Sequence, residues 1–204
     1  MHFISRLAAY ILVLVVCLGL SLGLGVDMAF AHSEGGITGG FISGFTHPIL
    51  GWDHVVAMVA VGLWGAFLGV PAIWILPIVF PMIMALGAAL GILGVPVPAV
   101  EAGIAGSAVV LGLLILLAIR SPLWLAAIIV GVFAIFHGYA HGTELPTAAN
   151  PFTYGIGFVF ATGLLHLLGI AFGLLVRWPL GSHLVRAGGG AIALVGFAFL
   201  FGFV

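Results

Sequence analysis

Long apolar stretches make up most of the chain, and short segments rich in proline and polar residues separate them. A helix needs about 20 apolar residues to cross the hydrocarbon of a bilayer, and six stretches after residue 32 are close to that length or longer. Their hydrophobicity is continuous rather than alternating, which disfavours a transmembrane β-barrel. We therefore predict an all-α integral membrane protein, a six-transmembrane-helix bundle. The predicted spans are 37–70, 72–93, 99–119, 122–141, 152–176 and 184–204.

The first of these stretches is too long for one straight crossing. Proline lacks a backbone N–H and interrupts a helix, so we expect a short entering segment, a break at the His47-Pro48 pair and a main helix from about Gly51 to Gly69. This arrangement puts His47, Asp53 and His54 in the outer third of the membrane. Asp53 then lies in a first helical turn, where the positive end of the helix dipole favours a carboxylate.

The N-terminus has the pattern of an export signal. An arginine precedes the apolar residues 7–26, and Ala29–Ala31 supplies the small-x-small pattern that signal peptidase cleaves. We predict a signal peptide over residues 1–31 and a membrane domain over residues 32–204, with His32 as the first mature residue. An uncleaved anchor is the alternative, because the apolar stretch is longer than a usual signal core.

Composition agrees with a chain that lies in a lipid bilayer. The sequence is 64% hydrophobic and 4% charged, with a mean hydropathy of +1.45, values that a water-soluble domain does not have. A net charge of −1, with four arginines and no lysine, leaves no basic surface for nucleic acid. We recognise no phosphate-binding glycine loop of an ATPase.

The arginines predict an orientation. If His32 starts outside, successive crossings place Arg120, Arg177 and Arg186 on the cytoplasmic side, where positive charge is enriched. We therefore expect a multi-pass protein of a bacterial inner membrane with an extracytoplasmic mature N-terminus.

Ionisable side chains recur near the predicted outer side. In the fourth stretch His137 and His141 are four residues apart and share one helical face, with Glu144 about one turn further on. Two imidazoles at this spacing hold one divalent cation, and a second helix completes the shell. Burying several ionisable groups in hydrocarbon is costly, so their clustering indicates a function rather than a structural role. We favour a metal site over a proton path. The predicted set is His47, Asp53, His54, His137, His141 and Glu144.

Three further residues are weaker metal candidates. The free amine and imidazole of His32 would chelate a metal together after cleavage. Glu101 begins the third stretch and is equally explained as a carboxylate in a first helical turn. His166 lies well inside the fifth stretch, where a relay below the cluster and a structural hydrogen bond are equal alternatives.

Three motifs resemble those of the HupE/UreJ family of small bacterial membrane permeases. They are HPILGWDHVVAMVAVG (47–62), VPVPAVEAGIAGS (95–107) and FHGYAHGTE (136–144). The resemblance implies a permease that supplies nickel to hydrogenase and urease. It also implies a role in metal passage for the two histidines and aspartate of the first motif and for the two histidines and glutamate of the last.

Nickel(II) suits this donor set, and cobalt, zinc and copper(II) are alternatives, since imidazole nitrogen and carboxylate oxygen bind all of them. We expect lipid and a divalent cation as partners, and leave open a homo-oligomer or a membrane-complex partner.

An enzyme is not expected. The alternatives are a zinc hydrolase of the alkaline-ceramidase type, with His54, His137 and His141 as ligands and Asp53 as base, and a proton-conducting or structural subunit.

Overall fold

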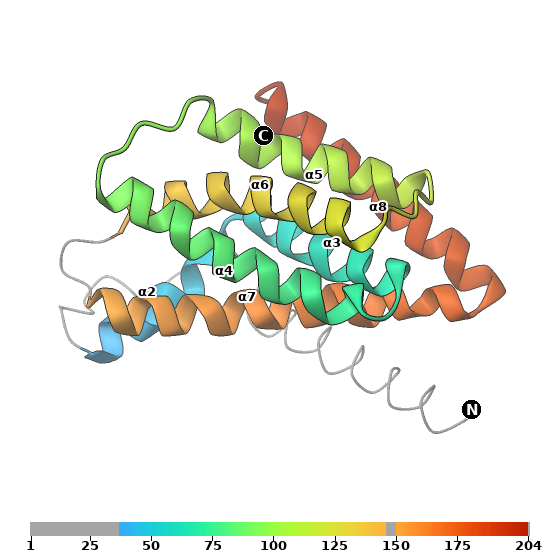
Figure 1. Cartoon of the computed structure of the whole chain (residues 1–204), viewed down its shortest axis with the longest axis horizontal. Coiled ribbons are helices and arrows are strands. Elements are labelled where there is room, and N and C mark those ends of the chain that lie inside the picture. The colour runs from blue at the N-terminus through green and yellow to red at the C-terminus, as the bar shows by residue number, and fades with distance from the viewer. Residues whose placement is uncertain (1–36, 146–149, 204) are drawn as a thin grey trace.

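The computed structural model describes residues 37–145 and 150–203, and all regular structure within them is helical (Figure 1). The all-α prediction is therefore confirmed for this part of the chain. The predicted signal peptide and His32 lie outside the described residues. The elements are α2 (Ile37–Leu50), α3 (Trp52–Leu68), α4 (Ala72–Ile92), α5 (Val100–Leu116), α6 (Leu123–Thr143), α7 (Pro151–Gly173), the 3-10 helix η1 (Leu174–Arg177) and α8 (Pro179–Leu200).

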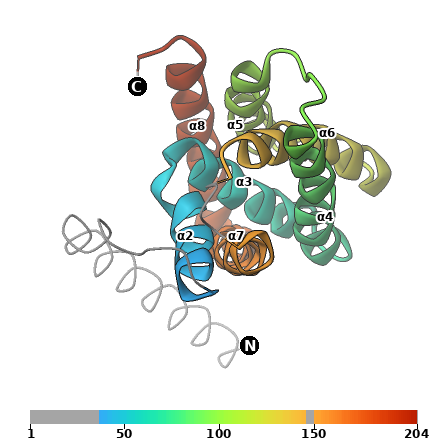
Figure 2. The ribbon, with the colours of Figure 1, turned by 90° about the vertical axis from the view of Figure 1, so that its left-hand side faces the viewer.

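Helix α3 lies at the centre of the bundle, with the other helices around it (Figure 2). It contacts α2, α4, α5, α7 and α8, and nearly all of its residues from Ala57 to Phe67 are buried. A helix that is apolar on every side is typical of a buried core helix or of a membrane span, and in α3 most of that surface is covered by protein. The first turn of α3 carries Asp53 and His54 at the end of this buried segment, where His54 is buried and Asp53 is part-buried.

Helices α2 and α3 meet at a bend of 81°. A break in this stretch is as predicted, but the predicted position at His47-Pro48 is wrong. Helix α2 continues through Pro48 to Leu50, so the backbone N–H that this proline lacks costs one intrahelical hydrogen bond without ending the helix. The chain turns instead at Gly51, whose backbone is extended, with φ −87° and ψ 105°.

The glycine at the bend leaves room for two polar neighbours. A Cβ at Gly51 would lie 3.0 Å from Asp53 Oδ1 and 3.1 Å from His54 Nδ1, closer than side chains normally approach. The turn therefore passes directly beside this Asp-His pair because residue 51 has no side chain.

The number of six spans is not confirmed. Four helical segments are each long and apolar enough to cross a membrane: α4, α6, α7 with η1, and α8. The bent α2–α3 pair is a further broken span or a re-entrant segment. Helix α5 matches the predicted third span but has 17 residues. At about 1.5 Å per residue it is roughly 25 Å long, shorter than a hydrocarbon layer of about 30 Å.

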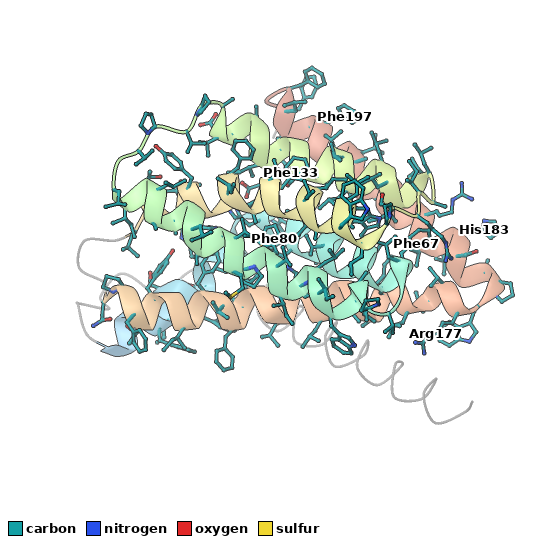
Figure 3. All side chains as sticks on the ribbon, viewed as in Figure 1. Phe67, Phe80, Phe133, Arg177, His183 and Phe197 are labelled. Carbon is teal, nitrogen blue, oxygen red and sulfur yellow. The ribbon has the colours of Figure 1, made fainter. Side chains whose placement is uncertain are left out.

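The described arginines lie at one end of the bundle. Arg186 Nε donates a 2.8 Å hydrogen bond to the carbonyl of Leu116 at the end of α5, and the Arg120 guanidinium lies 5.3 Å from the centre of the Phe67 ring. Figure 3 places Phe67 and Arg177 toward this same end. Charge is therefore strongly polarised along the bundle.

Helix α8 begins earlier than predicted. Pro179 occupies its first turn, a position that favours proline because the first N–H groups of a helix have no intrahelical partner. His183, which the sequence places in a loop, is consequently an exposed residue of α8 near the arginine end (Figure 3).

Helices α4 and α6 approach closely through glycines on both sides. A Cβ on Gly138 or Gly142 of α6 would overlap a backbone carbonyl of α4, and a Cβ on Gly87 of α4 would overlap a backbone carbonyl of α6. Small residues permit such backbone contact between membrane helices. The contact fixes the rotation of α6 about its axis, and with it the direction of the histidines next to Gly138 and Gly142.

We expect Gly87→Ala to destabilise the bundle by about 1–3 kcal/mol, because the added methyl group separates α4 from α6. Gly163→Ala on α7 is the matched control, since a Cβ there has no neighbour within 4 Å and alanine is the better helix former by up to about 1 kcal/mol. Unfolding of the two variants in detergent micelles measures the difference. Equal stability of both would contradict the close packing of α4 on α6.

Candidate metal centre

The predicted metal ligands come from three segments that meet at the end of the bundle opposite the arginines. Helix α2 supplies His47 near its C-terminus, and the first turn of α3 supplies Asp53 and His54. The last turns of α6 supply His137 and His141, and Glu144 follows as the C-cap of that helix.

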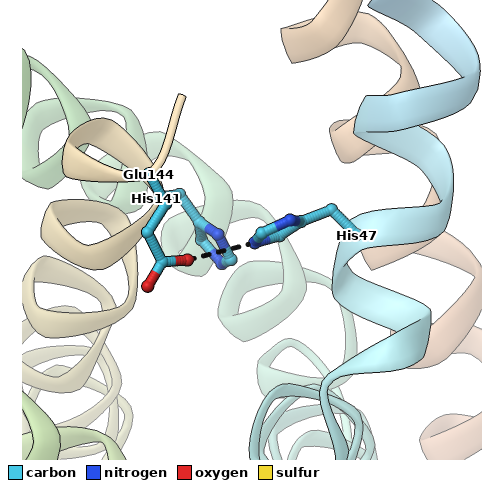
Figure 4. Close-up of side chains that lie close together, drawn as sticks. All are labelled: His47, His141 and Glu144. Carbon is cyan, nitrogen blue, oxygen red and sulfur yellow. Dashed lines mark ion pairs between the residues drawn. The ribbon is translucent and has the colours of Figure 1, made fainter. Parts of the chain in front are cut away.

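Three of these residues form a compact group, named here the outer group: His47, His141 and Glu144 (Figure 4). Each offers one ligand atom within 4.8 Å of the other two. His47 Nε2 lies 3.4 Å from Glu144 Oε2, and the rings of His47 and His141 are 4.8 Å apart. The Glu144 side chain is 58% exposed whereas His141 is buried. Two nitrogens and one oxygen therefore converge where the bundle meets its surroundings.

A second pair of imidazoles, named the inner pair, lies beside the outer group. It consists of His54 and His137, whose ring centres are 4.9 Å apart. The ring of His54 also lies 4.4 Å from that of His141, so the outer group and the inner pair are in contact through two histidines. His137 is completely buried and lies one helical turn further from the α6 C-terminus than His141.

The tautomer of His54 follows from its neighbour. Asp53 Oδ1 lies 2.8 Å from His54 Nδ1. An ionised carboxylate only accepts hydrogen bonds, so Nδ1 carries the proton and donates it. His54 Nε2 therefore presents its lone pair, and this buried atom has no hydrogen-bond partner among the described residues.

A cavity of about 390 Å³ lies beside these residues, between α3, α5 and α6. Three carboxylates line it, those of Asp53, Glu101 and Glu144, together with His54 and the ring of Tyr139. No lysine or arginine is among the lining residues. Because the described arginines lie at the other end of the bundle, no described arginine neutralises the carboxylates of this cavity, and the cavity attracts cations.

His166 lies deeper and does not touch the other histidines through its ring. The ring of Phe80 lies near both His137 and His166: its centre is 5.6 Å from that of His137 and 5.7 Å from that of His166. Phe80 is fully buried near the middle of the bundle (Figure 3). His166 Nε2 has no hydrogen-bond partner in the described part of the chain, so the predicted alternative of a structural hydrogen bond is not supported for this atom.

A separate apolar cleft of about 260 Å³ reaches His141 from the side, between α4, α6 and α7. Its walls include Met84, Ala88, Tyr154 and Phe158, but neither Asp53 nor His54. The polar cavity and the apolar cleft thus reach the cluster from different directions.

The structure brings together the six residues that the sequence grouped, and it adds Glu101 on the wall of the same cavity. Their role as metal ligands stays a prediction, as does that of His166.

Sequence reasoning missed Ser107 and Phe80, both of which contact His137. Ser107 is the one hydroxyl side chain in α5, and this polar residue in an apolar helix was the available signal. Nothing in the sequence distinguishes Phe80 from other phenylalanines.

Comparison with known proteins gives one consistent result. The profile of the family described as HupE / UreJ protein matches residues 12–199. The chain is 45% identical to Protein HupE of Rhizobium leguminosarum bv. viciae over 175 residues, which cover 85% of this chain and 92% of that protein. No solved structure gives a significant match.

We expect His141→Gln to weaken Co²⁺ binding by at least about tenfold, or ~1.4 kcal/mol, because His141 is the buried member of the outer group and touches the inner pair. Titration of the detergent-purified chain, followed by the visible absorption of cobalt, measures the affinity. His183→Gln removes an imidazole at the opposite end and should bind like the wild type. An equal loss in both variants would show that the cluster is not the binding position.

Proposed function

Because the chain belongs to the HupE/UreJ family, we propose that it is a secondary permease that moves a divalent transition-metal cation across a bacterial inner membrane. This family of proteins with membrane-spanning helices is related to metal transport. The observation that carries the proposal is the outer group, in which His47 of α2 and His141 and Glu144 at the end of α6 bring ligand atoms within 4.8 Å of one another.

Nickel(II) is the proposed cargo, with cobalt(II), zinc(II) and copper(II) as the competing ions. Imidazole nitrogens with one carboxylate oxygen suit these borderline cations better than they suit magnesium or calcium, which prefer oxygen ligands throughout. Neutral imidazoles also leave the site with little net charge, which favours release as well as binding.

The proposed route begins in the acidic cavity. Asp53, Glu101 and Glu144 concentrate cations there. The cation passes from the outer group to the inner pair and then past Phe80 to His166, the next unpartnered imidazole along the bundle axis. With the arginine end in the cytoplasm, the cavity faces the extracytoplasmic side.

A zinc hydrolase acting on lipid is not favoured. In such an enzyme the metal ligands and the base act together on a substrate that enters from the bilayer. Here the apolar cleft contacts His141, whereas Asp53 and His54 line the polar cavity and not the cleft. The groups that hydrolysis needs are therefore divided between two openings.

Uptake of radioactive nickel into proteoliposomes of the purified chain tests the transport proposal directly. We expect saturable Ni²⁺ uptake that falls by at least about tenfold, ~1.4 kcal/mol, in His47→Gln, with His183→Gln as the matched control. Inhibition of Ni²⁺ uptake by Co²⁺, Zn²⁺ and Cu²⁺ ranks these ions by the preference of the permease. Uptake no faster than in empty liposomes, at several applied ion gradients, would contradict secondary transport.

A substitution at His166 distinguishes transport of the cation from its binding at the outer group. We expect His166→Leu to leave Co²⁺ affinity at the outer group within about twofold of wild type while uptake falls at least about tenfold, because the variant loses the nitrogen beyond Phe80. Thr162→Val, which removes a buried hydroxyl one turn away on α7, controls for a general change in that helix. Unchanged uptake in His166→Leu would remove His166 from the route.

A further inference from the structure

Ser107 of α5 is a buried polar residue that directly contacts one of the imidazoles. Its side chain is completely buried, and its Oγ lies 3.0 Å from Nε2 of His137 on α6. The same Oγ donates a 2.6 Å hydrogen bond to the backbone carbonyl of Ile104, one turn earlier in α5.

These two contacts determine where the proton of His137 lies. A serine hydroxyl has a single hydrogen, and the Ile104 carbonyl, which only accepts, engages it. Ser107 Oγ is therefore the acceptor toward His137, and Nε2 must be the protonated nitrogen of that ring. The remaining nitrogen, Nδ1, presents a lone pair, is buried, and has no hydrogen-bond partner among the described residues.

The same logic holds on the other side of the inner pair, where Asp53 fixes the proton of His54 on Nδ1 and leaves the Nε2 lone pair unpartnered. Two neighbouring rings are thus held in opposite tautomers, each by a dedicated hydrogen bond. In metal sites, a hydrogen bond to the second nitrogen of a ligand histidine sets its tautomer, orients the ring and strengthens the ligand.

We propose that Ser107 is a positioning residue, which fixes the Nε2–H tautomer of His137 so that Nδ1 of His137 and Nε2 of His54 form an all-nitrogen binding position for a divalent transition-metal cation. This position is separate from the carboxylate-containing outer group. The assignment of a cation rests on the proposed function, whereas the tautomer does not depend on it.

The tautomer is tested first, in the full-length chain labelled with ¹⁵N-histidine. Two-bond ¹H–¹⁵N spectra distinguish the two neutral tautomers of an imidazole, and the signal that disappears in His137→Asn identifies residue 137. We expect Nε2–H in the wild type and a shift toward Nδ1–H in Ser107→Ala. Ser107→Thr, which keeps the hydroxyl, should restore the wild-type spectrum. Ser107→Cys keeps the approximate volume with a poor acceptor and should behave like Ser107→Ala.

The binding position is tested by Co²⁺ titration of the same proteins. Loss of a partner to the second nitrogen typically weakens metal binding by about 10–100-fold, and we expect this range for Ser107→Ala and recovery in Ser107→Thr. Thr162→Val removes another fully buried hydroxyl and should change neither the spectrum nor the affinity. A wild-type spectrum together with wild-type affinity in both Ser107→Ala and Ser107→Cys would overturn the proposal.

The outcomes also separate this proposal from the proposed function. If Ser107→Ala changes the His137 spectrum and weakens Co²⁺ binding while wild-type proteoliposomes take up no metal, the positioning role stands and transport fails. If wild-type uptake is normal and Ser107→Ala keeps the Nε2–H tautomer, transport stands and the positioning role is wrong.

Discussion

Imidazole nitrogens that are buried without a protein partner are the feature on which the rest of this structure depends. In the described part of the chain, one such nitrogen belongs to each of His54, His137 and His166, and two belong to His141. An unpaired buried polar atom costs about 1–3 kcal/mol, and hydrocarbon outside the bundle supplies no hydrogen bonds in compensation. Each neutral imidazole has one nitrogen with a lone pair, and a cation that binds this lone pair removes much of the cost for that atom. In the proposed site, therefore, part of the binding energy comes from relieving unfavourable burial rather than from preformed charge.

Such a cluster needs rigid walls, because unpaired polar groups otherwise turn toward each other or toward water. Helix α3 provides one wall, since nearly all of its residues from Ala57 to Phe67 are buried and its first turn lies at the cluster. The glycine contacts between α4 and α6 provide another, since they set the rotation of α6 and hence the directions of His137 and His141. The polar contacts of the site are therefore held in place by the packing of α3 and by the close contact of α4 with α6.

The sequence predicted the helical class and the grouping of six site residues because both have a periodic basis: continuous apolar stretches for spans, and the four-residue spacing of His137 and His141 for a shared face. It did not predict the contact of His47 with Glu144, which depends on the angle between α2 and α3. The break was misplaced because the prediction weighed proline alone, whereas Gly51 provides the space that Asp53 and His54 require. A single serine such as Ser107 has no periodic pattern, so its role follows only from the two atoms it touches.

In the proposed site, the outer group and the inner pair would differ in what they require of a cation. Glu144 is well exposed, so a cation at the outer group would keep water ligands, and any divalent ion attracted by the acidic cavity would be able to reach the outer group. His137 is fully buried, and in the proposed route a cation that binds there would exchange water ligands for nitrogen. Hard cations such as magnesium give up water reluctantly and gain little from imidazole, whereas nickel, cobalt and zinc gain strong bonds. In the proposed route, selection among divalent ions therefore occurs at the second step, where the fixed tautomers of His54 and His137 present two nitrogens and no carboxylate.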